Sequence, residues 1–228
     1  IFEEFKNFLK QNNFISKEWN ALNILVQNAS TVGLIDLKIF PKEKSDFSFF
    51  DNLENKKFKL LYLLGSDNLE FKKDGEFIVY QGSHGDKGAE LADIILPSAA
   101  FCEQVGLYEN LEGRVQESKK ASYPIGEAKE DWKIFNLIIK KLGNQDQINK
   151  FETLRQDALK LVKNFSTINE LPNFNLAETN DLHPDFFSEE VNIKELNYYF
   201  SNSISRASKT MSECHQIRQK IAKTGTVN

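Results

Sequence analysis

The stretch Phe58-Lys59-Leu60-Leu61-Tyr62-Leu63-Leu64-Gly65-Ser66-Asp67 decides the fold class of this chain. Its apolar run is almost unbroken and shows no alternation, which is typical of a parallel strand buried on both faces. The glycine, serine and aspartate that follow end the strand and open a loop. Two shorter apolar runs come next, at Phe77–Tyr80 and at Asp93–Leu96, and Pro97 stops the second. We therefore predict an α/β fold with a doubly wound, mostly parallel sheet flanked by helices.

The clearest helix is predicted for Asp131–Leu142. Acidic residues Glu130 and Asp131 lie at its start, where the helix dipole favours negative charge, and Gly143 lies just past its end. Its apolar residues recur at helical spacing and are expected to face the core: Trp132, Phe135, Ile138, Ile139 and Leu142.

Four further helices follow from apolar periodicity and end signals. They are 1–10; a second helix capped by Ser16, with Trp19 and Ala29 on its apolar face and Gly33 as its stop; 151–165; and 203–222. Segments 40–55 and 171–187 are predicted to be a connector and an extended stretch. The C-terminal helix carries a narrow apolar stripe, and its other face is basic, with Arg206, Lys209, Arg218, Lys220 and Lys223. This outward face is either an interface with an acidic partner or a solvated surface.

Composition sets limits on the class of protein. The chain has 228 residues, of which 40% are hydrophobic and 27% charged, and its net charge is −4. This acidic balance argues against a general role on nucleic acids or anionic membranes, and no apolar run approaches the ~20 residues that cross a bilayer. The two cysteines, Cys102 and Cys214, are too few for a disulfide scaffold or a zinc site, so we interpret both as buried thiols.

The segment Gln81–Gly88 holds glycines at positions 82, 85 and 88, which allow tight turns and a close approach of the backbone to a ligand or another chain. It matches neither dinucleotide-binding nor P-loop spacing, so a structural turn is favoured over a phosphate cradle. His84 and Asp86 lack the further ligands of a metal site. Ser83 beside His84 does not form the nucleophile elbow of a hydrolase.

Arg114 lies in the polar segment Asn110–Gln116. An arginine there can clamp a carboxylate or phosphate in a bidentate manner. The alternative, which we favour from the residues alone, is an internal ion pair with Glu112 or Glu103 that holds a turn at Gly113.

Several of these pieces occur in one order along the chain. Ala92–Pro97 is followed by Glu103, then by Asn110–Gln116, Gly126, and Asp131-Trp132. This series resembles molybdopterin oxidoreductases. A narrower resemblance links 19–37, Leu61–Asp67, Tyr80–Ala89 and the tail Ser203–Met211 to the large iron–sulfur (75 kDa-type) subunit of respiratory complex I.

The resemblance implies a molybdopterin-oxidoreductase-like α/β domain at 1–143, followed by a helical and extended C-terminal region at 144–228. It also implies a non-catalytic structural part in the peripheral arm, which supports electron transfer from NADH to ubiquinone. The family's iron–sulfur clusters bind Cys-rich segments that are absent from this chain, and its molybdenum cofactor is understood to be lost. We therefore expect no catalytic, cofactor-binding or metal-binding residue and no cofactor in this chain, with Gly82, Gly85, Gly88 and Arg114 shaping turns.

The partners that the resemblance implies are other peripheral-arm subunits, above all the Cys-rich iron–sulfur half of the same subunit, whether as a separate chain or not. Nucleic acid binding and membrane insertion are not expected, and the implied location is the matrix side of the mitochondrial inner membrane. Two alternatives stay open. One is a fragment of an active molybdopterin-dependent oxidoreductase, in which the glycine loop and Arg114 touch the cofactor; the other is a free-standing nucleotide-binding module.

Overall fold

The computed structural model describes residues 2–15, 21–26, 28–39, 49–143, 148–162, 167–172 and 197–224. The chain divides into two compact units that interleave along the sequence. The first contains Ile1–Lys42, Val105–Lys119 and Asp146–Glu190, and the second contains Glu43–Gln104, Lys120–Gln145 and Val191–Asn228. The domain boundary expected after residue 143 stays a prediction.

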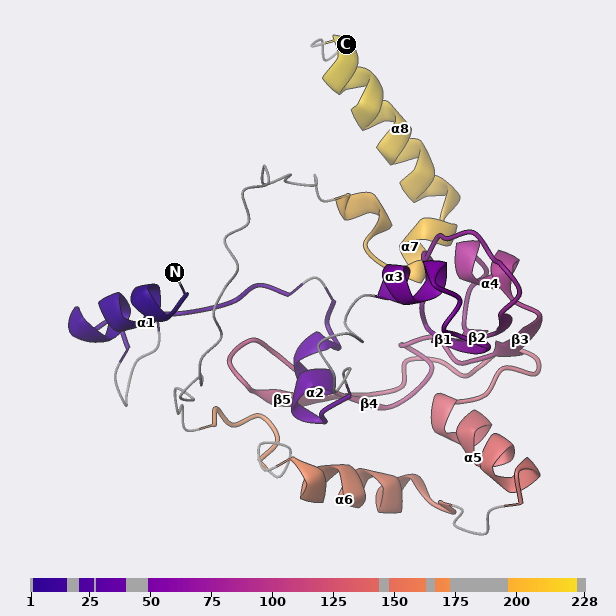
Figure 1. Cartoon of the computed structure of the whole chain (residues 1–228), viewed down its shortest axis with the longest axis horizontal. Coiled ribbons are helices and arrows are strands. Elements are labelled where there is room, and N and C mark those ends of the chain that lie inside the picture. Colours follow the sequence, from indigo (N-terminus) through magenta and orange to yellow (C-terminus); the bar gives the residue numbers. More distant parts are fainter. Residues whose placement is uncertain are drawn as a thin grey trace. The chain divides into compact units, whose positions relative to one another are not determined.

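The second unit is built on a parallel sheet. Strands β1 (Leu60–Leu64), β2 (Phe77–Gly82) and β3 (Ile94–Pro97) lie in the order β1-β2-β3 (Figure 1). Leu61 pairs with Ile78, and Val79 pairs with Ile94. All three predicted strands and the predicted parallel, mixed α/β class are therefore confirmed. The burial predicted for both faces of the first strand is correct only in part, because Leu60 is 58% and Leu64 49% exposed.

Helices cover both faces of this sheet, as expected for a doubly wound layer. One face presents the buried cluster Leu61, Leu63, Ile78 and Tyr80, which packs against α3 (Phe49–Glu54), α4 (Lys87–Leu91) and the loop between β1 and β2. Side chains alternate along a strand, so Tyr62 lies on the other face. There its ring stacks on Phe135 of α5 (Asp131–Lys141), with centroids 5.7 Å apart.

Helix α5 confirms the prediction for 131–142 to within one residue, and its glycine stop is also correct. Gly143 has φ 82°, the left-handed conformation in which glycine ends helices. The predicted buried face is correct only in part: Phe135 packs on the sheet, whereas Leu142 is 80% exposed. Ile134, which was not assigned to that face, is the buried residue of the helix.

The C-terminal part of this unit is helical but divided. Short helix η3 (Tyr198–Phe200) precedes α7 (Ser203–Ala207) and α8 (Lys209–Thr224). The single helix predicted for 203–222 is therefore wrong at Ser208. Ser208 has extended backbone angles, and its hydroxyl accepts a hydrogen bond from the Met211 amide at 3.4 Å. This serine thus caps a new helix and does not continue the old one.

The first unit contains α1 (Phe2–Gln11), α2 (Thr31–Asp36), the antiparallel hairpin β4 (Gly106–Glu109) and β5 (Val115–Ser118), and α6 (Phe151–Leu161). Buried Val115 and Val162 form its core with Leu37, Leu107, Ala158 and Leu159. The helix predicted at 1–10 is confirmed where the structure describes it. The helix predicted for 151–165 is confirmed up to Leu161 but ends there, because Val162 is extended; residues 163–166 lie outside the described part.

Three local predictions differ from the structure. The helix expected after Ser16 is wrong at 21–26, which have no regular structure, and the helix nearby is α2, which contains the expected stop, Gly33. Ser16 and Trp19 lie outside the described residues. Helix α3 occupies the end of the expected connector, because Phe49 stacks on Phe58 and meets the ring of Phe71 edge-on. The stretch 171–187 lies mostly outside the described residues.

Candidate functional site at the strand ends

The loops after β1 and β2 form the candidate site. Ligands of open α/β sheets bind beyond the carboxyl ends of the strands, and here those ends carry Asp67, His84 and Asp86. A cavity of about 110 Å³ lies against these three residues and against Ser203 and Arg206 of α7. This volume is well below the ~300 Å³ at which small-molecule pockets usually begin.

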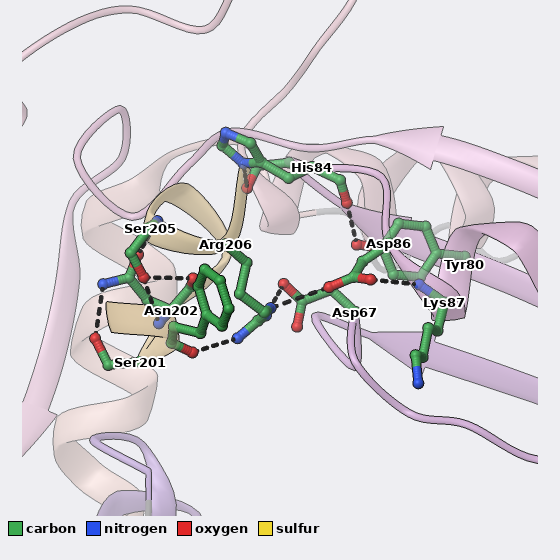
Figure 2. Close-up of polar contacts among 11 residues, drawn as sticks. Asp67, Tyr80, His84, Asp86, Lys87, Ser201, Asn202, Ser205 and Arg206 are labelled. Carbon is green, nitrogen blue, oxygen red and sulfur yellow. Dashed lines mark hydrogen bonds and ion pairs between the residues drawn. The ribbon is translucent and has the colours of Figure 1, made fainter. Parts of the chain in front are cut away.

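Arg206 lines this cavity and reaches both aspartates beside it (Figure 2). Its guanidinium forms an ion pair through Nη2 with Asp67 and donates from Nε to Asp86 Oδ2 at 3.0 Å. Nη1 donates to the carbonyl of Phe200 at 3.2 Å. The side chain of Arg206 is only 19% exposed and that of Asp67 only 10%. The prediction that Arg206 belongs to an outward basic face is therefore wrong, because the break at Ser208 turns α7 toward the sheet.

Two of the loop glycines are required by close packing. A Cβ on Gly88 would lie 2.4 Å from the carbonyl oxygen of Ser66, and one on Gly82 would lie 2.4 Å or less from the Tyr80 ring. A Cβ on Gly85 would meet nothing within 4 Å. The close approach that the glycine spacing predicted is thus an approach to the protein itself.

The loop does not fit a phosphate group. The amide of Lys87 donates to Asp86 Oδ1 at 2.9 Å, and the amide of Gly88 donates to the carbonyl of Asp67 at 3.0 Å. Both amides at the start of α4 therefore already have acceptors. The carboxylates of Asp67 and Asp86 lie beside them and share the one positive charge of Arg206, so this group of three side chains keeps a net negative charge that disfavours an anion. The described residues at this edge do not fit the phosphate of a molybdopterin cofactor.

Tyr80 joins the sheet core to the loop. Its hydroxyl donates to the carbonyl of His84 at 2.6 Å (Figure 2). Burial, together with the nearby Asp67 and Asp86 carboxylates, raises the pKa of Tyr80 to about 12, although Arg206 opposes this shift. The phenol therefore stays protonated at neutral pH and acts as a hydrogen-bond donor that fixes the loop.

The Ser83–His84–Asp86 group does not form a catalytic triad. Ser83 Oγ lies 3.0 Å from His84 Nδ1, but Asp86 binds the Lys87 amide and Arg206. Within the described ranges, no three His, Cys, Asp or Glu side chains gather as a metal site would need. His183 lies outside those ranges, and His215 packs on the ring of Phe200, with centroids 4.8 Å apart.

A buried polar network under α5 was not predicted. Gln81 is fully buried; its amide nitrogen donates to Asp131 Oδ1 at 2.6 Å, and its carbonyl oxygen accepts from the Tyr62 hydroxyl. Gln104 donates to the other oxygen of Asp131 at 2.9 Å. A glutamine at the end of an apolar strand was the available signal, because a buried amide requires partners.

Arg114 belongs to the other unit, where it lies beside a turn of the backbone. The turn between β4 and β5 is fixed by Asn110, whose side chain accepts from the amides of Glu112 and Arg114, and by Gly113 at φ 78°. The guanidinium of Arg114 donates to the carbonyl of Asn169 at 2.7 Å. The expected turn at Gly113 is confirmed. The guanidinium of Arg114 binds a backbone carbonyl, however, and the carboxylate of Glu103, one of its two predicted partners, accepts a hydrogen bond from the Ala100 amide.

The cysteines are unpaired and half-buried, so the prediction of buried thiols holds only in part. No helix in the part of the chain that the structure describes is long and apolar enough to span a membrane.

Comparison with known proteins adds to this geometry. The family model described as molybdopterin oxidoreductase matches residues 1–141, which include both strand-end loops. The chain belongs to the molybdopterin oxidoreductase family. A second model, described as the C-terminal part of an NADH-ubiquinone oxidoreductase subunit, matches residues 185–214, which include Arg206. The two matches together therefore contain every residue around the strand-end cavity.

Individual relatives narrow the comparison. The chain is 35% identical over 95% of its length to the NADH-ubiquinone oxidoreductase 75 kDa subunit of Reclinomonas americana. It is 37% identical over 93% to an NADH-quinone oxidoreductase subunit of Rickettsia bellii, and 37% identical over 90% to the mitochondrial NADH-ubiquinone oxidoreductase 78 kDa subunit of Candida albicans. It covers 32%, 30% and 29% of these relatives, respectively, and so spans about a third of their length.

Proposed function

We propose that this chain is a non-catalytic structural part of the large iron–sulfur subunit of respiratory complex I. In that role it supports electron transfer from NADH to ubiquinone by packing in the peripheral arm, and the electrons pass through neighbouring protein. The similarity to 75 kDa and 78 kDa subunits over at least 90% of the chain supports the assignment to complex I.

The proposed lack of catalysis rests on one observation. At the strand ends, where this fold binds ligands, Arg206 forms ion pairs with both Asp67 and Asp86 and lines a cavity of only about 110 Å³. The amides at the start of α4 are satisfied internally. A substrate or cofactor at this place would have to displace an internal ion pair, which is costly once its charges are partly desolvated.

The proposed partners are other peripheral-arm subunits, especially the Cys-rich iron–sulfur half of the same subunit. The proposed location is the matrix side of the mitochondrial inner membrane. The resemblance supplies both, and relatives that carry "mitochondrial" in their names agree with the location.

Native-gel separation of respiratory complexes, followed by mass spectrometry of the band that contains this chain, tests the proposal. We expect the chain to migrate with NADH dehydrogenase activity and with Cys-rich iron–sulfur protein. Migration as a free chain contradicts the complex I assignment. Metal analysis of the same band tests the alternative of an active molybdenum enzyme: one molybdenum atom per chain contradicts the non-catalytic role.

A further inference from the structure

The contact between α7 and the strand-end loops joins distant parts of the sequence. Arg206 and Asp86 are 120 residues apart. The two aspartates lie in the region that matches the molybdopterin oxidoreductase model, whereas Arg206 lies in the region that matches the C-terminal model of the NADH-ubiquinone oxidoreductase subunit. One side chain therefore connects two segments that separate family models describe.

Helix α7 depends on this contact for its position. It has only five residues, far fewer than an isolated helix needs to persist in water. A capping box between Asn202 and Ser205 closes its first turn, with the Ser205 amide donating to Asn202 at 2.9 Å. That box fixes the local fold of α7 but makes no contact with the sheet layer, so docking requires another interaction.

Arg206 supplies that interaction with all of its donor nitrogens. Nε and Nη2 reach carboxylates on two different loops, and Nη1 reaches the Phe200 carbonyl in the segment before α7. A planar guanidinium presents its donors in a rigid fork, which an ammonium group cannot reproduce. The geometry is therefore specific to arginine, as Figure 2 shows for the two aspartates.

We propose that Arg206 is a latch. It docks α7 on the loops after β1 and β2 through Asp67 and Asp86. The latch holds α7 in place in the chain itself, whether or not a partner is bound. The inference therefore goes beyond the proposed role in complex I and is tested without it.

The test compares Arg206→Ala with the unchanged 228-residue chain by hydrogen exchange. We expect the amides of Ser203–Ala207 and of the loop at 83–88 to exchange roughly tenfold faster or more, because a hydrogen bond to a charged group contributes about one power of ten in an equilibrium. Arg218→Ala is the matched control, since it removes an exposed arginine from α8. It should leave both segments unchanged.

Chemical rescue separates a latch from a general loss of packing. Guanidinium chloride at low millimolar concentration should restore slow exchange in Arg206→Ala, because the free ion refills the space between Asp67 and Asp86. Potassium chloride at the same concentration should not. Unchanged exchange in Arg206→Ala, or equal effects of the two salts, overturns the proposal.

A second variant covers the case in which Arg206→Ala does not fold. Arg206→Lys keeps the charge, but its single ammonium cannot bind both aspartates with the geometry of the fork. We expect faster exchange in Ser203–Ala207 than in the unchanged chain. Exchange as slow as in the unchanged chain shows that any cation suffices and refutes the arginine-specific latch.

Discussion

Replacement of Gly88 by alanine tests whether the glycine loop is a packing device. The new methyl group would lie 2.4 Å from the carbonyl oxygen of Ser66 and 3.3 Å from the Tyr80 ring. The nearer atom belongs to the backbone, so it cannot move aside by changing a rotamer. The loops after β1 and β2 must separate instead, which also lengthens the hydrogen bond of 3.0 Å from the Gly88 amide to Asp67.

The expected magnitude follows from two opposing contributions. Overpacking costs about 3 kcal/mol, the upper part of the usual range, because a backbone atom is the obstacle. The loss of backbone freedom in the unfolded chain offsets about 0.5–1 kcal/mol when glycine becomes alanine. Gly88→Ala should therefore lower the free energy of unfolding by about 2 kcal/mol.

Gly85→Ala is the matched control in the same loop. A Cβ there would meet nothing within 4 Å, and its φ is not positive. Only the unfolded-state contribution remains, so Gly85→Ala should be neutral or stabilising by up to about 1 kcal/mol. Urea unfolding followed by circular dichroism measures both variants. If Gly88→Ala is as stable as Gly85→Ala to within about 0.5 kcal/mol, the packing argument is wrong.

Two further predictions concern buried charge and polarity in the sheet unit. Gln81→Leu removes the acceptor for Tyr62 and the donor to Asp131 in a fully buried position. It should lower the free energy of unfolding, measured by thermal unfolding, by about 2 kcal/mol. The exposed Gln116→Leu is the control, and equal unfolding temperatures for the two variants would contradict the network. Burial opposes ionisation of Glu130, but hydrogen bonds from Lys120 and Trp132 outweigh it and hold the pKa of that carboxyl below its usual range. The ionised Glu130 therefore contributes fully to the free energy of unfolding above the unfolded-state pKa of about 4.3. This contribution is lost as the pH falls through the lower pKa of the folded state. Lys120→Met should make the free energy of unfolding fall less steeply toward acid pH, whereas the exposed Lys140→Met should not. If the two variants lose stability in parallel as the pH falls, the Lys120–Glu130 ion pair does not act as proposed.

The strands and the central helix could be predicted because their signals are local. The apolar run before Gly65 can bury both faces only inside a covered parallel sheet. For α5, a charged start and a glycine stop enclose an apolar stripe, and each signal acts within one or two turns. These elements therefore appear in the structure close to their predicted bounds.

Three features were missed: a helix that depends on contacts outside its own segment, a hairpin, and a break between two helices. Helix α3 forms where Phe49 meets Phe58, which precedes β1, and Phe71, which lies in the loop after β1. The β4–β5 hairpin has strands of four residues each, too short to show an alternating pattern. The break at Ser208 arises because the serine hydroxyl caps α8. This local hydrogen bond competes with continuation of the helix, although the apolar residues keep helical spacing across the break.

The sequence by itself determined the α/β class, the parallel strands and the family resemblance, because periodicity and motif order are written along the chain. Tertiary structure alone decided what the strand-end loops do. Asp67, Asp86 and Arg206 carry no spacing signal, since a chain separation of 120 residues between the last two leaves no periodic trace. Only folding brings these charges within hydrogen-bonding distance. In the folded chain the residues at the expected ligand site bind one another as an internal ion pair.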